Sequence, residues 1–268
     1  MVIAAPVTAR PSATVVVVRE GSSGPELLLV RRRAGDAFGD SYAFPGGVID
    51  ADETAAHAFC LGRTAAQADR ALDLPGGGLD YYSAAIRELF EETGILLARN
   101  ADGIWASDGS TFDDLRYQVD KGLLPWPKFL HRQGLCMAGD ALHYFAWWET
   151  PYSQPKRWTT RFFLAELPPG QEASHDGSEV TDSRWLTADR ALALGKQGEL
   201  PMPFPTMLNL RDLSRFGSVN ELIDWAKRRP EDGIRKIRPA LAFENGKPKF
   251  LIPGDPGYDE ADQEWQKA

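Results

Sequence analysis

Two short stretches of this chain decide its fold: the loop FPGG at residues 44–47 and the segment RELFEETGI at residues 87–95. The second stretch predicts the end of a helix over residues 81–93, because that range contains neither proline nor glycine and Gly94 supplies a C-terminal stop. Between the two stretches, Glu53 follows the loop by six residues. The chain thus presents, in order, a double-glycine bend, a single glutamate and an acidic helix end.

Three acidic side chains share one face of the predicted helix. Glu88, Glu91 and Glu92 are spaced i, i+3 and i+4. Such carboxylates repel one another unless a cation lies among them, and oxygen donors on a preformed helix suit Mg²⁺ or Mn²⁺. The plain alternative is a solvated acidic face that ends at a glycine cap. Because the nine-residue pattern should arise by accident about once in 10⁴ chains of this length, we favour the metal site.

These residues resemble the signature box of the Nudix hydrolases, a family that uses divalent metal to cleave a nucleoside diphosphate linked to another group. The positions that carry the resemblance are Gly47, Glu53, Arg87, Glu88, Glu91, Glu92 and Gly94. In the usual box seven residues separate the first glutamate from the arginine, whereas residues 54–86 intervene here, an excess of 26. An interrupted box of this kind resembles the peroxisomal coenzyme A diphosphatases and their bacterial relatives.

The resemblance implies a role for each matching position. The metal ligands would be Glu88, Glu91, Glu92 and the backbone carbonyl of Gly47. Gly46 would border the pyrophosphate, since paired glycines permit close approach of the backbone. Glu53 and Arg87 would lock the loop to the helix and aim the metal carboxylates.

The sequence leaves the general base open between two glutamates. Glu91 lies on the predicted helix, and Glu179 opens a predicted strand over residues 179–186. In the family an acidic residue next to the last core strand often completes the site, which makes Glu179 a candidate either for the base or for a further metal contact. His175 and Asp176 are also candidates for this role.

Two groups of arginines are candidates for substrate binding. Three consecutive arginines, 31–33, alternate across the end of a predicted strand, so one or two should face the substrate, and we take Arg31 and Arg33 as these contacts. The alternative is a solvated strand end. Arg157 and Arg161 lie in an aromatic and basic segment that would stack a base and hold phosphate. For that segment the alternative is core packing.

Composition describes an ordinary globular protein, with 43% apolar and 25% charged residues. The net charge of −8 gives no support for nucleic-acid binding through bulk electrostatics. Only Cys60 and Cys136 are present, which suits a reducing cytosol and rules out a disulfide scaffold. We find neither a signal peptide nor a membrane span, and residues 265–268 are not a Ser-Lys-Leu peroxisomal address. We therefore expect a cytoplasmic protein.

The resemblance implies an α+β fold, the Nudix fold, which is an α/β/α sandwich around a mixed sheet. The residue pattern predicts strands at 13–19, 26–33, 141–149, 159–167 and 179–186, and a final hairpin of 240–243 with 248–252. It predicts further helices at 63–74, 111–121, 126–133, 206–216 and 219–227 and one starting at 187. We expect one domain, 1–268, with a C-terminal extension at 200–268 that packs on the core.

The interruption of the box forms an insertion at 57–79. It contains an alanine-rich helical segment, followed by the sequence PGGG at residues 75–78. This layout suggests a helical flap on a flexible joint that gates or recognises the substrate. A tolerated surface insertion is the alternative.

For the substrate, the branch resemblance implies coenzyme A or acyl-coenzyme A, cut to adenosine 3′,5′-bisphosphate and a 4′-phosphopantetheine product. A companion motif of many coenzyme A-cleaving relatives is matched only loosely by residues 27–31, Gly39 and the loop 44–47. ADP-ribose, a dinucleotide polyphosphate or a capped nucleotide is therefore the alternative. A Nudix-fold sensor that binds without cleaving is a third hypothesis, against which the intact box argues. Dimers are common in the family, so a homodimer is compatible with the resemblance.

Overall fold

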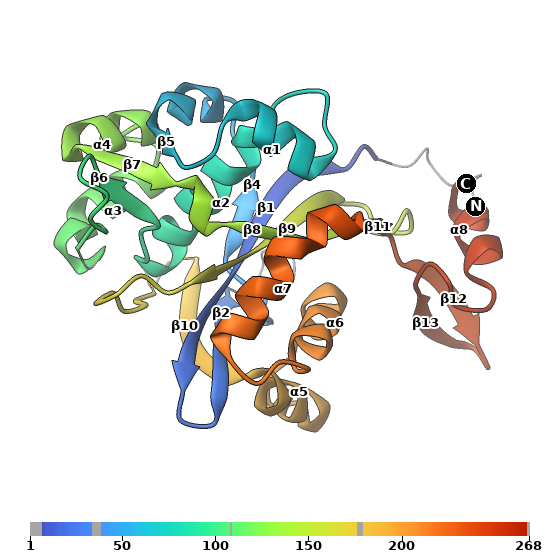
Figure 1. Cartoon of the computed structure of the whole chain (residues 1–268). Coiled ribbons are helices and arrows are strands. Elements are labelled where there is room, and N and C mark those ends of the chain that lie inside the picture. Colours follow the sequence, from blue (N-terminus) through green and yellow to red (C-terminus); the bar gives the residue numbers. More distant parts are fainter. Residues whose placement is uncertain (1–6, 34–38, 108, 176–178, 267–268) are drawn as a thin grey trace.

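The computed structural model of the protein describes residues 7–33, 39–107, 109–175 and 179–266. Its centre is a mixed sheet (Figure 1) with the strand order β10 (Val180–Thr187), β2 (Gly24–Arg32), β1 (Arg10–Gly21), β9 (Trp158–Glu166), β8 (His143–Glu149) and β11 (Lys236–Ile237). Two short strands extend it: β3 (Tyr42–Ala43) pairs with β2, and β4 (Gly46–Val48) pairs with β1. The central pair β1–β9 is parallel and the pairs β1–β2 and β8–β9 are antiparallel, so the sheet is mixed as expected.

Helices cover both faces of the sheet, and β1 shows why. Successive side chains of a strand point to opposite faces, and here Val15 and Val17 lie in one core cluster while Val16 and Val18 lie in the other. The first cluster includes residues of α1 (Ala65–Leu72), α2 (Gly78–Thr93) and α4 (Trp126–Gln133). The second includes residues of α5 (Ala188–Gln197), α6 (Phe204–Leu213) and α7 (Val219–Asp232). The predicted α/β/α sandwich is confirmed.

The acidic helix of the sequence is α2. It ends at Thr93 as predicted and begins at Gly78, three residues before the predicted start. Gly94 adopts the left-handed conformation, with φ of 72°, and its N–H donates to the Phe90 carbonyl at 2.9 Å. The helix stop read from the sequence is therefore a glycine cap of the usual kind.

The insertion in the box is helical and packs on α2. Residues Glu53–Phe59 form the 3₁₀ helix η1, and α1 follows with Thr64 as its N-cap. Ala68 and Leu72 of α1 are fully buried in the first core cluster. The gating role of this segment stays a prediction.

A small three-stranded sheet beside the insertion was not predicted. It has the order β5 (Cys60–Leu61), β7 (Leu135–Ala138) and β6 (Ala98–Asn100). Strands of two to four residues are too short to show a period of two in the sequence. Around this sheet lie η2 (Gly109–Phe112), α3 (Asp113–Asp120), α4 and η3 (Gly139–Ala141), of which the two α-helices fall inside the predicted ranges.

The C-terminal residues form a small unit at one edge of the molecule (Figure 1). The predicted hairpin is present as β12 (Ala240–Glu244) and β13 (Lys247–Leu251), and α8 (Tyr258–Gln266), which was not predicted, covers it. Arg238 ties this unit together through Asp262, with Nη2 2.6 Å from Oδ2. Across the described residues, no helix combines the length and apolar character needed to cross a membrane.

Candidate active site

The box residues form a buried ion-pair network along α2. Glu53, from η1, is only 2% exposed and accepts a hydrogen bond from Arg87 Nε at 2.8 Å. The Ser83 hydroxyl donates to the other oxygen of Glu53. The second guanidinium nitrogen of Arg87 donates to the Val48 carbonyl at 3.1 Å and lies 3.3 Å from Asp50. Arg87 thereby joins α2, η1 and β4, the short strand that contains both glycines.

The remaining nitrogen of Arg87 contacts the acidic face. Its Nη1 lies 2.8 Å from Glu88 Oε1 and 3.0 Å from Glu91 Oε2. One guanidinium therefore spans four carboxylates, those of Asp50, Glu53, Glu88 and Glu91. This arrangement fixes the orientation of two of the predicted metal ligands through a residue that would not itself bind metal.

The double-glycine bend lies directly against the same helix face. The Gly46 N–H donates to Glu92 Oε2 at 3.0 Å. A Cβ on Gly47 would collide with the Glu88 carboxylate, and a Cβ on Gly46 would collide with the Ala13 carbonyl. Gly46 also has φ of 151°, so both positions require glycine.

Arg32 holds the third carboxylate. Its Nη2 is 3.1 Å from Glu92 Oε1, and the same nitrogen donates to the Gly46 carbonyl. The sequence interpretation selected Arg31 and Arg33 from this run and passed over Arg32. The signal that was missed is the alternation of side chains along β2. Leu28 and Val30 pack in the core cluster that contains α2, and Arg32 lies on the same face of the strand.

Burial makes these carboxylates hard to ionise. Desolvation raises the pKa of Glu91 to about 8 and that of Glu92 to about 7, and it also raises the pKa values of Glu53 and Glu88. The positive charge of Arg87 opposes the shift at Glu91, and that of Arg32 opposes it at Glu92. The two arginines do not fully compensate the buried negative charge, so a further cation would be favoured here.

The residues fit a divalent metal ion by their chemistry. Among the residues that the structure describes, no three carboxylate, imidazole or thiol groups converge as they stand on a point where an ion would sit. The donor set is nevertheless suitable, since Glu88, Glu91 and Glu92 provide hard oxygen ligands from one helix. The Glu88 carboxylate itself occupies the room that a side chain at Gly47 would take, so the bend and this predicted ligand are in direct contact.

Comparison with known proteins decides the family. Residues 63–213, more than half of the chain, match the family model described as NUDT19 Nudix domain. The chain is a Nudix hydrolase. As a member of this family it is a pyrophosphohydrolase that acts on nucleotide derivatives, and Nudix hydrolases generally use divalent metals.

Relatives and a solved structure support the same assignment. An acyl-coenzyme A diphosphatase NUDT19 from Xenopus laevis is 26% identical, covering 90% of this chain and 73% of the relative. The human protein of that name is 27% identical, covering 89% and 74%. A crystal structure of a NUDIX hydrolase from Alicyclobacillus acidocaldarius aligns with a TM-score of 0.69 and 26% identity, covering 81% of this chain and 96% of that one. This Nudix hydrolase therefore resembles the coenzyme A diphosphatase branch.

In this Nudix hydrolase, the other arginines that were predicted as substrate contacts lie outside the ion-pair network along α2. Arg31 reaches Asp40 at 3.4 Å on the surface. Arg33 is exposed, and its N–H donates to the Glu179 carbonyl at 2.9 Å. Their role as substrate contacts stays a prediction, with Arg32 the member of the run that the structure brings to the carboxylates.

Arg157 and Arg161 are buried and engaged by the protein itself. Arg157 donates to the carbonyls of Thr150 and Val7 at 3.1 and 2.7 Å and lies 3.0 Å from Glu149. Arg161 stacks over the Trp147 ring, 3.5 Å from its centroid, and also donates to the Tyr144 hydroxyl. The structure thus gives both residues packing partners, and their role in phosphate binding is untested.

Glu179 lies immediately before β10, which starts one residue later than predicted, and it is close enough for its charge to contribute to the raised pKa of Glu92. Asp176 lies outside the described residues. His175 borders a hollow beside Glu91 with a volume of about 320 Å³.

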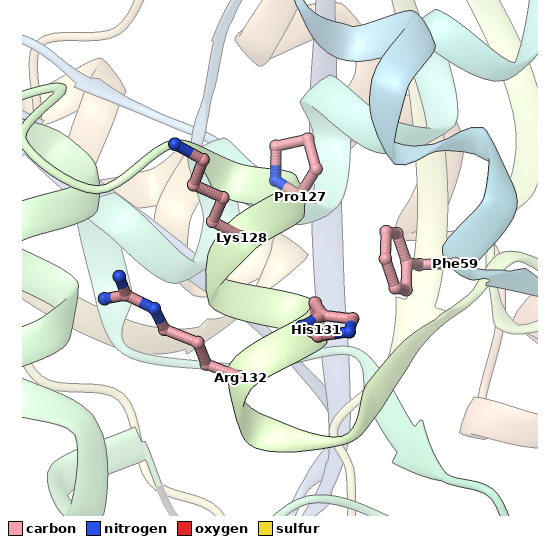
Figure 2. A pocket seen from close by; sticks show the side chains of 5 residues that line it. All are labelled: Phe59, Pro127, Lys128, His131 and Arg132. Carbon is pink, nitrogen blue, oxygen red and sulfur yellow. The ribbon is translucent and has the colours of Figure 1, made fainter.

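A second hollow of about 280 Å³, shown in Figure 2, lies between the end of η1 and α4. It is lined by Phe59, Pro127, Lys128, His131 and Arg132, none of which the sequence placed in the site.

Proposed function

We propose that this Nudix hydrolase is a Mg²⁺- or Mn²⁺-dependent diphosphatase of coenzyme A or acyl-coenzyme A. The observation that carries the proposal is the grouping of the three box-helix carboxylates against the double-glycine bend, with Glu53 and Arg87 locking them together. The substrate class is supported by the relatives that are named acyl-coenzyme A diphosphatases and match most of this chain. The products would be adenosine 3′,5′-bisphosphate and a 4′-phosphopantetheine compound.

In this proposal Glu88, Glu91 and Glu92 hold the metal together with the Gly47 carbonyl. Bound Mg²⁺ or Mn²⁺ supplies charge neutralisation at the diphosphate and a more acidic water. Arg87 orients Glu88 and Glu91 by contacting one oxygen of each. Gly46 borders the diphosphate in this proposal, and its lack of a side chain lets the bend pack against Ala13 and Thr14 of β1.

A carboxylate must accept the proton of the attacking water. Glu91 is a candidate because it lies on the box helix with the other two carboxylates. Glu179 is the alternative, because its charge contributes to the raised pKa of Glu92. The pair is separated by comparing Glu91→Gln with Glu179→Gln at saturating metal: the variant that lacks the base loses kcat, while its KM for substrate changes little.

The first experiment is a substrate panel headed by coenzyme A and acetyl-coenzyme A, followed by ADP-ribose and diadenosine polyphosphates. Each is incubated with Mg²⁺, with Mn²⁺ or with EDTA, and the phosphorylated products are identified. We expect hydrolysis of the coenzyme A compounds that EDTA abolishes. Cleavage of ADP-ribose or a dinucleotide with no cleavage of coenzyme A would reject the proposed substrate and retain the metal site.

Glu92→Gln tests the site itself. The variant should lose metal-dependent hydrolysis and still melt as a folded unit, because the amide keeps the shape of the side chain but loses its charge. Glu199→Gln, an exposed glutamate at the end of α5, is the matched control and should keep full activity. Wild-type activity in Glu92→Gln would exclude the proposed metal centre.

We also propose that residues 1–268 act as one domain, in the cytoplasm, on a small-molecule substrate. The net charge of −8 supports the absence of a nucleic-acid partner. A homodimer is compatible with the family. Sedimentation of the purified chain separates monomer from dimer, and limited proteolysis with one resistant product would support the single domain.

A further inference from the structure

The hollow beside Glu91 is built at the C-terminal end of α2 and is not explained by the metal site. Its lining comes from α2, from α3 and from the loop before β10: Glu91, Asp113, Arg116, Tyr117, Asp120, Ser174 and His175. Its volume is about 320 Å³, which is at the lower end for small-molecule sites. Glu91, a predicted metal ligand, forms the inner wall of this hollow, so a molecule bound at the metal would extend into the hollow.

Arg116 and Ser174 fix the inner end of the hollow to the box helix. The last four carbonyls of a helix have no partner within it. Arg116 Nε donates to the Glu91 carbonyl at 2.9 Å, and the Ser174 N–H donates to the Thr93 carbonyl at 2.8 Å. Arg116 Nη1 also donates to the Ser174 hydroxyl at 3.0 Å, so the two anchors are joined.

Two further contacts hold the loop in place. The side chain of Gln171 is buried, accepts from the Leu96 N–H at 2.8 Å and donates to the carbonyls of Leu96 and Ala106 at 3.0 and 3.1 Å. A Cβ on Gly94 would lie 3.0 Å from the Ser174 hydroxyl, which is closer than most real contacts. The wall of the hollow is therefore held by specific hydrogen bonds.

The outer wall combines an exposed aromatic ring, Tyr117, which is 60% exposed, with carboxylates whose charge is balanced. Of the three carboxylates, Glu91 contacts Arg87 at 3.0 Å and Asp120 contacts Lys121 at 2.5 Å, while Arg116 lies beside Asp113 in the lining. Asp120 is close enough to Glu91 to help raise its pKa. This charge balance disfavours a phosphate group and suits a neutral chain whose N–H and O–H groups donate hydrogen bonds.

We propose that this hollow is the subsite for the uncharged, amide-bearing arm that lies on one side of the scissile diphosphate. The inference rests on the proposed coenzyme A substrate, whose two halves differ in just this respect. The nucleoside half carries an extra phosphate, for which the hollow offers no surplus positive charge. The pantetheine half carries amide N–H and hydroxyl donors for Asp113 and Asp120 and an alkyl chain that packs on the Tyr117 ring.

The test compares two substrates on matched variants. One substrate is coenzyme A, and the other is the methyl ester of 3′-phosphoadenosine 5′-diphosphate, which keeps the nucleoside and the diphosphate but lacks the arm. Asp113→Lys removes an acceptor of the subsite, and Asp114→Lys changes the adjacent exposed aspartate, which does not line the hollow. Tyr117→Ala removes the ring, with Leu123→Ala as the control for an exposed apolar side chain.

We expect Tyr117→Ala and Asp113→Lys to raise the KM for coenzyme A about 10-fold with little change in kcat. The KM for the methyl ester should not change, and the two control variants should behave as wild type towards both substrates. Equal KM changes for the two substrates, or no change for coenzyme A, would overturn the subsite. Circular dichroism of each variant shows that the comparison is made between folded proteins.

Direct binding separates failure of this inference from failure of the proposed function. Pantetheine has no diphosphate and needs no metal, so its saturation-transfer NMR signal on the metal-free protein reports the subsite alone. A signal that Tyr117→Ala abolishes, in a protein that does not cleave coenzyme A, would support the subsite and reject the substrate. Cleavage of coenzyme A with no pantetheine signal in wild type would support the substrate and reject the subsite.

Discussion

Two buried ion-pair clusters in this protein use the same residue types in opposite proportions. The box cluster joins carboxylates to fewer arginines: Glu53, Glu88, Glu91 and Glu92 with Arg32 and Arg87. The Glu149 cluster, where β8 meets the C-terminal unit, joins cations to fewer carboxylates: Arg157, Lys236 and Arg238 with Glu149 and Asp262. The first is left with surplus negative charge and the second with surplus positive charge.

The comparison of the two clusters indicates that surplus charge predicts a binding site only where the charged atoms are not all engaged by other groups of the protein. In the Glu149 cluster, all three nitrogens of Arg157 donate to the protein, and its guanidinium stacks over the Tyr152 ring, 4.3 Å from the centroid. Arg238 stacks on the same ring at 4.2 Å. The cluster therefore links β8 to the C-terminal unit. In the box cluster, Arg87 contacts Oε1 of Glu88 and Oε2 of Glu91, which leaves the second oxygen of each carboxylate to accept an ion.

The largest effect should come from removing one charge from each cluster. Glu88→Gln should lower kcat by about 10²- to 10³-fold, as the loss of one electrostatic group in an active site commonly does. Glu149→Gln should lower the melting temperature and leave kcat within about two-fold. Initial rates on coenzyme A in saturating Mg²⁺ measure the first effect. If both variants lose activity equally, the distinction between the clusters fails.

The next effect concerns the central arginines. Arg87→Ala removes the cation that pairs with buried Glu53, which costs about 3 to 5 kcal/mol of unfolding free energy. Arg157→Ala should cost less, because Lys236 and Arg238 still pair with Glu149. Mg²⁺ should restore much of the stability of Arg87→Ala, because an ion replaces the lost positive charge, and none of the stability of Arg157→Ala. Urea unfolding with Mg²⁺ and with EDTA measures both. Equal recovery in the two variants would contradict the assignment of metal to the box cluster.

A smaller effect should follow from filling the space beside Glu88. In Gly47→Ala the new methyl group displaces the carboxylate, and we expect metal affinity to fall about 10- to 100-fold, as it does when the surroundings of a ligand are disturbed. Gly76→Ala is the control, because a Cβ there meets nothing within 4 Å. Titration of Mn²⁺ followed by electron paramagnetic resonance gives both affinities. Unchanged affinity in Gly47→Ala would show that the bend does not border the metal.

The smallest effect is a pH dependence from outside both clusters. Burial, together with the charges of Lys227 and Arg63, lowers the pKa of His143 from 6.5 to about 4. The unfolded chain then binds a proton that the folded chain does not, so this residue removes stability as pH falls from 6.5 towards 4. The raised carboxyl pKa values of the box cluster act in the opposite direction, removing stability as pH rises.

The variant His143→Gln isolates the histidine contribution. Its melting temperature, measured in EDTA between pH 4.5 and 7.5, should fall less steeply on acidification than that of wild type. Identical slopes would show that folding does not lower the pKa of His143.

Local signals in the sequence were enough for most elements. The glycine stop at Gly94 and the hairpin of 240–243 with 248–252 act within a few residues and lie where they were predicted. The helix predicted to start at 187 starts at Ala188, with Thr187 as its N-cap. The same is true of the i, i+3, i+4 spacing on α2. The short strands β5, β6 and β7 escaped prediction because they carry no period and form only by pairing with one another.

The sequence by itself determined the acidic helix, its stop and the family, because these depend on spacing along one element and on a motif read in order. Only the tertiary structure decided which arginine meets Glu92, since β2 presents Arg32 rather than Arg31 to the face that α2 covers. It also decided that Arg157 is held by Glu149, and that α3 and the loop at Ser174 meet at the end of the box helix. Contacts between residues far apart in the chain depend on how the elements pack, and no local pattern records that packing.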